Sequence, residues 1–228
     1  MANQDQKFTT TAPCVLYFPN LIEPKAYAPK GKKAAPDAKK KFSSGFLFKA
    51  DHPDVATLKA AILAAAKALF PTMDVAAEYK AGRFKLPFKT GEKELATFQA
   101  KLTEQGKEYT DQRDWLKGTI KFQADSGEDI RPKLGVRKDG QDIDLTPDTM
   151  GAHRNAFYSG VEALAMFTVH PYKAINSEAI PGVKLYLSVV HSLNRGKPHF
   201  EGLSASEVFK GVAGQAVAED PLGDEVPF

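Results

Sequence analysis

The sequence has few of the residues that build metal centres. Cysteine occurs once in 228 residues, at Cys14, which excludes an intrachain disulfide and a cysteine metal cluster. The five histidines lack the spacing of HExxH or of another ligand motif. An EF-hand is also excluded, because no DxDxDG frame with a closing glutamate runs through the acids Asp139, Asp142, Asp144 and Asp148. We therefore expect no metal site and no cofactor.

Long apolar runs are missing as well. No stretch approaches the roughly 20 apolar residues that cross a bilayer, and the N-terminus lacks a signal-peptide pattern. With 43% hydrophobic and 26% charged residues, the chain is expected to be soluble, globular and cytoplasmic, without membrane contact. The sequence also lacks a P-loop, a nucleophile elbow and a carboxylate cluster at a defined spacing, so an enzyme such as a nuclease is not expected.

Charge is distributed unevenly along the chain, although the net charge of +3 is modest. Between residues 25 and 41 the only acid is Asp37, and the lysines are Lys25, Lys30, Lys32, Lys33, Lys39, Lys40 and Lys41. Such lysines repel one another, so the segment favours an anionic partner; a solubilising surface loop is the alternative. The end of the chain is acidic, since no basic residue follows Lys210.

Two paired β-strands are expected between Phe157 and Asn194, joined by a polar loop from Tyr172 to Gly182. Alternate apolar positions predict the buried faces: Val161, Ala163, Ala165, Phe167 and Val169 in one strand, and Val183, Leu185, Leu187, Val189 and Leu193 in the other. The outer face of the second strand is predicted to meet water or a ligand, and it carries Lys184, Tyr186, Ser188, Ser192 and Asn194. The loop is a candidate for gripping a ligand, or an ordinary surface hairpin.

Earlier segments predict further strands and one helix. A strand at 15–18 is expected to end at Pro19, and alternation at 115–124 predicts a strand with one polar, basic face. Residues 53–70 predict a helix, with an apolar stripe and helix-start residues before Pro71. The side chains of Phe42, Phe46 and Phe48 share one face of a strand; they are either core or a platform for stacking bases.

This pattern predicts a mainly β protein with an early helix, long loops and an OB-fold-like five-stranded barrel, an architecture that often binds oligonucleotides. An immunoglobulin-like sandwich would have more evenly spaced strands and no helix of this length. The barrel is assigned to residues 12–203, between a flexible N-terminus at 1–11 and a flexible acidic tail at 204–228. Asp139 and Gly140 predict a hairpin turn.

The tail ends in DEVPF, which is similar to the acidic tip of bacterial single-stranded-DNA-binding proteins, where acids precede Ile-Pro-Phe. The folded part resembles phage-encoded single-stranded-DNA-binding proteins with an OB-fold. The segments that carry this resemblance are NLIEPK (20–25), KFSSGFLFKADHPD (41–54), NAFYSG (155–160), HPYKAIN (170–176) and GVKLYLSVVHSLNRGKP (182–198). Residues 73–115 match poorly and are a candidate insertion. The tail carries fewer acids than is usual in those phage proteins.

The resemblance implies a non-enzymatic, sequence-independent binder of single-stranded DNA in phage replication or recombination, in the cytoplasm of the bacterial host. Its acidic tip would recruit replication or recombination proteins. Candidate phosphate contacts are Lys25, Lys32, Lys33, Lys40, Lys41, Lys117, Lys121, Arg131, Lys133, Arg137, Arg154 and Lys173. Candidate stacking residues are Phe46, Phe48, Trp115, Tyr158, Tyr172 and Tyr186. The partner-binding tip is Asp224, Glu225, Val226, Pro227 and Phe228.

The alternative is a protein-interaction or virion-assembly module that acts through the tail. The sequence leaves open whether the protein forms a homo-oligomer.

Overall fold

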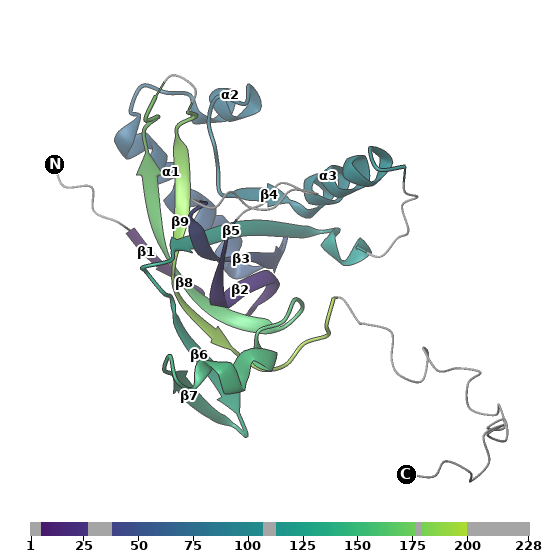
Figure 1. The fold of residues 1–228 in the computed structure, drawn as a ribbon. Helices are drawn as coiled ribbons and strands as arrows, with labels where there is room; N and C mark the ends of the chain where they lie inside the picture. Colours follow the sequence, from purple (N-terminus) through teal and green to yellow (C-terminus); the bar gives the residue numbers. More distant parts are fainter. Residues whose placement is uncertain (1–5, 27–37, 107–112, 177–178, 200–228) are drawn as a thin grey trace, which may run out of the picture.

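The computed structural model describes residues 6–26, 38–106, 113–176 and 179–199 (Figure 1). The strands are β1 (Gln6–Thr9), β2 (Cys14–Ala26), β3 (Lys40–Lys49), β4 (Phe88–Thr90), β5 (Thr119–Gly127), β6 (Lys133–Lys138), β7 (Gln141–Leu145), β8 (Glu162–Tyr172) and β9 (Gly182–Ser192). The helices are α1 (Pro53–Leu69), α2 (Val75–Lys80) and α3 (Gly91–Thr103), with the 3₁₀ helices η1 (Asp114–Leu116) and η2 (Met150–Ala156).

Five of these strands close into a barrel. Around the ring β2 pairs with β3, β3 with β5, β5 with β9, β9 with β8, and β8 with β2. All of these pairs are antiparallel except β5 with β9, which is parallel. In chain order the ring strands are β2, β3, β5, β8 and β9, and this five-stranded arrangement confirms the predicted OB-fold-like barrel.

The remaining strands extend the barrel. At one edge β1 pairs with β8, β4 pairs with β5 beside the ring, and β6 pairs with the far half of β9. The β6–β7 hairpin lies at the lower end of the molecule in Figure 1. Its two-residue turn has positive φ at both Asp139 (51°) and Gly140 (78°), a backbone that suits Asp-Gly, so the predicted turn is confirmed.

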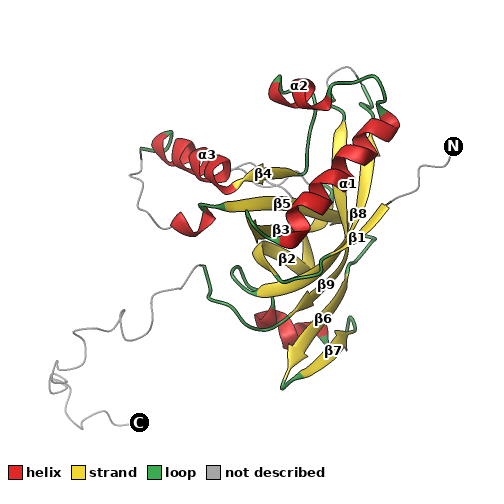
Figure 2. Cartoon of the chain, turned by 180° about the vertical axis from the view of Figure 1, so that it is seen from behind, coloured by secondary structure: helices red, strands yellow, loops and turns green. Residues whose placement is uncertain are grey.

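Helix α1 lies across the barrel on the side that faces the viewer in Figure 2. Pro53 occupies its first turn, and the ring nitrogen of His52 accepts a hydrogen bond from the Asp54 amide. The helix ends at Leu69, and Phe70 is its C-cap. The sequence correctly predicts that the helix stops before Pro71. Most of the apolar stripe is buried in the main core, with Leu58 and Ile62 fully enclosed, whereas Leu63 is exposed, so α1 supports the barrel.

The N-terminal prediction is corrected for residues 6–11. Residues 6–9 form β1, and the Asp54 carboxylate accepts hydrogen bonds from the backbone N (2.8 Å) and the Oγ1 (2.6 Å) of Thr11. Buried Asp54 (3% exposed) therefore fixes the segment to the start of α1, because a buried carboxylate must be hydrogen-bonded.

Two strand boundaries also differ from prediction. The first predicted strand does not end at Pro19, because β2 continues to Ala26. Its register against β3 shifts between Tyr17 and Asn20 and again between Asn20 and Lys25. Proline cannot donate to the ladder, but it is tolerated at such irregular positions. The predicted strand at 115–124 begins only at Thr119, since residues 114–116 form η1 and Gly118 has φ of 68°.

The paired strands are β8 and β9, and their alternation is confirmed along β8. A register shift between Met166 and Phe167 leaves an extra residue in β9, and one extra residue exchanges the two faces. Beyond it Val190 and Ser192 are buried, whereas Val189 is only half-buried. The prediction that Ser192 faces outward is therefore wrong, and its hydroxyl donates to the Ala156 carbonyl (2.7 Å).

Candidate nucleic-acid interface

Strands β3 and β5 pair along their length, and we call the side that faces away from the main core the β3–β5 face. Its residues are Lys41, Ser43, Gly45 and Leu47 from β3 and Lys121, Gln123 and Asp125 from β5; Lys41 and Gln123 are exposed, whereas Gly45 and Leu47 are buried under neighbouring side chains, Leu47 in a small cluster with Tyr17. The register places Gly45 opposite Gln123 and Ser43 opposite Asp125. The two strands are the second and third of the barrel, whose face binds oligonucleotides in OB-folds.

The inward face of β3 carries the phenylalanine row. Phe46 and Phe48 are 0% and 1% exposed, and they contact other core rings, Phe46 with Phe167 (centroids 4.8 Å apart) and Phe48 with Phe122 (5.3 Å). A base cannot reach either ring. The hypothesis that Phe46 and Phe48 stack on DNA is therefore wrong, and the core alternative is correct for them.

A different aromatic group borders the β3–β5 face. This aromatic rim consists of Tyr17, Phe18, Phe98, Arg113 and Trp115. The Tyr17 ring centroid is 4.6 Å from that of Phe18 and 5.6 Å from that of Trp115. The Arg113 guanidinium is 3.5 Å from the Phe98 centroid and 5.6 Å from that of Phe18, and it donates to the Tyr17 hydroxyl (3.3 Å). Phe18 is 49% exposed, so one ring beside a cation is open to solvent.

Tyr17 is held from below by a buried ion-pair cluster. Glu94 of α3 pairs with both Lys121 (2.8 Å) and Lys89, and the Lys121 ammonium is 4.7 Å from the Tyr17 ring centroid. Burial lowers the pKa of Lys121, although Glu94 opposes this shift. Burial disfavours ionisation of Glu94, but the two lysines outweigh it and its pKa is lowered. Lys121 is thus paired and mostly enclosed, and it supports the rim more than it offers charge to a phosphate.

Burial also raises the pKa of the Tyr17 hydroxyl to about 12, in spite of the opposing effect of Arg113. Tyr17 is therefore neutral at physiological pH and adds no negative charge to the β3–β5 face.

The opposite end of the β3–β5 face is basic. The Asp125 carboxylate lies between the ammonium groups of Lys41 (3.6 Å) and Lys184 (3.4 Å). Lys184 is also 5.5 Å from the ring centroid of Tyr186, a residue that is 36% exposed. In the register Lys25 is paired with Lys41. The structure thus brings together the predicted residues Lys25, Lys41 and Tyr186, whereas Lys40, next to Lys41 in β3, is exposed on the other side of the strand.

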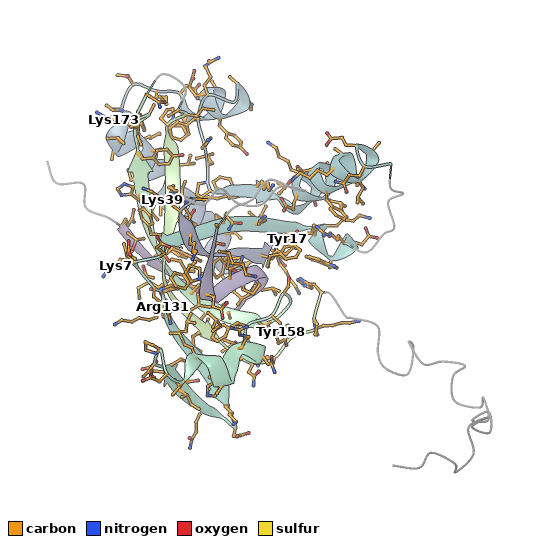
Figure 3. The ribbon with its side chains drawn as sticks, in the orientation of Figure 1. Lys7, Tyr17, Lys39, Arg131, Tyr158 and Lys173 are labelled. Atoms are coloured by element: carbon orange, nitrogen blue, oxygen red, sulfur yellow. The ribbon has the colours of Figure 1, made fainter. Side chains whose placement is uncertain are left out.

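The predicted gripping residues Tyr172 and Lys173 lie at the end of β8, where Figure 3 places Lys173 at the upper end of the molecule. Lys173 is exposed, whereas Tyr172 is half-buried and burial raises the pKa of its hydroxyl. They flank the β3–β5 face without belonging to it.

Other predicted residues lie elsewhere. Arg131 is 5.3 Å from the ring of buried Phe42, and Tyr158 donates to the Gly196 carbonyl (2.8 Å); Figure 3 shows both labels in the lower half of the molecule. Three more basic residues are in ion pairs: Lys117 with Asp114, Arg137 with Asp142, and Arg154 with Glu23. Arg154 lines a hollow together with Lys25. Lys133 is exposed on β6.

The hydrogen-bonded Arg137 guanidinium, together with His191, lowers the pKa of Asp142 to about 2 although burial opposes the shift. The Arg137 guanidinium is therefore already paired within the β6–β7 hairpin. The predicted residues Lys32 and Lys33, as well as the whole acidic tip, lie outside the described residues.

Sequence reasoning missed Tyr17, Phe18 and Arg113. For the first two the sequence predicts only a short strand that ends at Pro19, and Arg113 falls where periodicity is weak. A signal was present, because adjacent aromatic residues on a strand cannot both point into the core.

Trp115 was predicted to stack on bases, but one face of its ring is already occupied. The His199 ring stacks on it with centroids 3.7 Å apart and planes 15° apart. Burial lowers the pKa of His199 to about 4, so this imidazole is neutral at pH 7.

Within the described ranges, no three His, Cys, Asp or Glu side chains are grouped as metal ligands. Across the same part of the chain, no helix is both long and apolar enough to cross a membrane.

The five-stranded barrel, with its second and third strands β3 and β5 paired side by side, defines an OB-fold protein. The fold is similar to that of the C-terminally truncated single-stranded DNA-binding protein from bacteriophage Enc34, with 12% identity and a TM-score of 0.51 over 84% of this chain and 86% of that one. It is also similar to gp2.5, a single-stranded DNA binding protein encoded by bacteriophage T7, with 12% identity and a TM-score of 0.50 over 95% of this chain and 100% of that one. At these identities the similarity establishes the fold alone. No protein-family model and no curated protein matches the sequence.

Proposed function

We propose that this protein binds single-stranded DNA without sequence preference and without catalysing a reaction. The observation that carries the proposal is the β3–β5 face, where the OB-fold strands of the oligonucleotide-binding type lie between an aromatic rim, exposed at Phe18, and a cluster of lysines. A groove that combines cations for the backbone with rings for the bases is the usual construction of such proteins.

The two kinds of group have separate roles. Phe18, at the exposed edge of the rim, and Tyr186, at the other end, each present a ring to solvent, and a base stacked on a ring gains roughly 1 to 3 kcal/mol. Lys41 and Lys184 lie between them and attract phosphates. Every base has a π-face, so this recognition is independent of sequence.

The fold comparisons support the same function. The Enc34 and T7 proteins that share this fold are described as single-stranded DNA-binding proteins. By this likeness we assign the chain to phage DNA replication or recombination in the bacterial cytoplasm. The terminal DEVPF supports recruitment of a replication or recombination protein, because acids beside a terminal ring and carboxylate suit a basic pocket with an apolar centre.

The test is fluorescence anisotropy with a labelled single strand and its duplex at two salt concentrations. With about five phosphate contacts, raising salt fourfold should weaken single-strand binding roughly hundredfold. The duplex should bind far more weakly, because its bases are not open to the rim. Absence of binding at low salt, or equal binding of both forms, would overturn the proposal.

Deletion of residues 219–228 separates DNA binding from the tail. Under the proposal the truncated protein binds single-stranded DNA as well as the full chain, or more tightly, because four acids are removed. Loss of all DNA binding on deletion would instead favour a module that acts through its tail.

A further inference from the structure

A hollow of about 320 Å³ opens between α2 and α3, above β4 and β5. Its size falls within the roughly 300 to 1,000 Å³ typical of small-ligand sites. The residues that line it are Tyr79, Leu86, Pro87, Phe88, Lys89, Lys93, Lys121 and Gln123. All of them except Lys121 and Gln123 belong to residues 73–115, the candidate insertion of the sequence analysis.

The lining of this α2–α3 hollow is basic on one side. Three lysines contribute to it, Lys89, Lys93 and Lys121, and the described lining residues include no acid. Glu94 compensates two of them, since it pairs with Lys89 and Lys121. Lys93 is exposed, and its ammonium extends across to α2. An anion at the mouth of the hollow would therefore meet Lys93 first.

The other side of the hollow is apolar and aromatic. Tyr79 is half-buried, and its ring centroid is 5.2 Å from the Lys93 ammonium. Leu86, Pro87 and Phe88 continue this wall. The backbone N–H of Gln123 donates a hydrogen bond to the Pro87 carbonyl (2.8 Å), and this bond attaches the wall to β5. A cation beside a ring and an apolar wall suits a phosphate attached to a base.

The hollow is continuous with the β3–β5 face. Lys121 and Gln123 line the hollow and are also outward residues of that face. In Figure 1, β4 runs along β5, with α2 above it and α3 to its right. A DNA strand that crosses the exposed Gln123 side chain and continues toward β4 would enter the hollow.

We propose that the α2–α3 hollow is an additional single-stranded-DNA subsite, which takes a nucleotide next to those on the β3–β5 face and so lengthens the bound stretch. This inference rests on the proposed function. It assigns residues 73–115 a role in setting the number of nucleotides covered.

The test variant is Lys93→Glu. Lys93 lies in the first turn of α3, where its amide donates to the Thr90 side chain, and an acid is favoured in a first turn by the helix dipole. The substitution should therefore leave the fold intact while it replaces the cation at the mouth of the hollow. Lys101→Glu is the matched control, because it makes the same charge change on an exposed residue of the same helix, about 12 Å further along its axis.

Anisotropy is measured with oligothymidylates of roughly 4 to 16 nucleotides, the range of site sizes for one OB-fold. For Lys93→Glu, the longest oligonucleotide should bind about tenfold more weakly, whereas the shortest should bind as Lys101→Glu does. The length at which affinity stops rising should also become shorter. Lys93→Ala should show the same pattern with a smaller loss, and circular dichroism confirms that each variant is folded.

Two results overturn the inference in different ways. If the wild-type protein binds but Lys93→Glu weakens all lengths to the same extent as Lys101→Glu, the subsite is wrong and the proposed function stands. If the wild-type protein binds no oligonucleotide at any length, both fall.

Discussion

Gly45 lies directly beneath Tyr17 on the β3–β5 face. A Cβ atom at residue 45 would be 3.0 Å from Tyr17 Cδ1 and 3.1 Å from Lys121 Cε, and contacts this short force the neighbouring side chains to move. Because Gly45 has no side chain, the Tyr17 ring of β2 can pack directly on the backbone of β3. The position of the rim depends on this glycine.

Replacing Gly45 with valine should therefore displace Tyr17 and, through its contact with the exposed Phe18 ring, weaken single-stranded DNA binding about tenfold. Overpacking should also lower the free energy of unfolding by about 1 to 3 kcal/mol. Anisotropy and urea denaturation measure the two effects. Gly127→Val on β5 is the control, since a Cβ there meets nothing within 4 Å; equal affinities of the two variants would contradict the prediction.

Phe18 is expected to be a true stacking residue. It is 49% exposed and lies beside the Arg113 guanidinium. Phe18→Leu removes the ring but keeps an apolar side chain, so it should weaken single-strand binding by about 1 to 2 kcal/mol and change stability little. Oligonucleotide titration followed by anisotropy measures the loss, and wild-type affinity in this variant would exclude stacking on Phe18.

Phe46 should behave in the opposite way. Its ring is fully buried against Phe167, so Phe46→Leu should lower the free energy of unfolding by about 1 to 2 kcal/mol through the space it leaves. The folded variant should bind DNA as the wild type does. A specific loss of affinity in folded Phe46→Leu, measured well below its unfolding midpoint, would restore the stacking hypothesis for this row.

Local patterns predicted the barrel well but its binding face only in part. Alternation along β8 and the cap at Pro53 are properties of neighbouring residues, and they fixed a strand and α1 correctly. The inward turn of Phe46 and Phe48 depends on which face of β3 the rest of the ring covers, and alternation alone does not say which face is buried. Arg113 joins Tyr17 across 96 positions of sequence, and no short-range signal reports such a contact.

Asp125 should restrain DNA binding. Its carboxylate is 3.6 Å from the Lys41 ammonium and 3.4 Å from that of Lys184, so both cations are partly neutralised before a phosphate arrives. Asp125→Asn should raise affinity for single-stranded DNA about threefold to tenfold at low salt, with the gain shrinking as salt is added. Stability should change by less than about 1 kcal/mol, as for other surface pairs.

The control for this variant is Asp142→Asn on β7. It makes the same change of net charge and also removes an ion pair, that with Arg137, but on a hairpin away from the β3–β5 face. Anisotropy should show little gain for Asp142→Asn. If both variants gain equally, net charge explains the effect and Asp125 has no special position.

The stack of His199 on Trp115 should respond to pH. Burial lowers the pKa of His199 to about 4 in the folded protein, whereas a released histidine titrates near 6.5. Between these values the released ring takes up a proton that the stacked ring does not. Falling pH therefore favours release, and the stack should be complete above pH 6.5 and lost progressively as the pH falls toward 4.

Trp115 is the only tryptophan in the chain, so its fluorescence reports this equilibrium directly. Wild-type emission should be constant above about pH 6.5 and change as the solution is acidified toward pH 4. His199→Phe keeps an aromatic ring against Trp115 without a titrating group, and its emission should stay flat over the same window. Identical pH profiles for the two proteins would mean that carboxylates elsewhere, and not His199, govern the environment of Trp115.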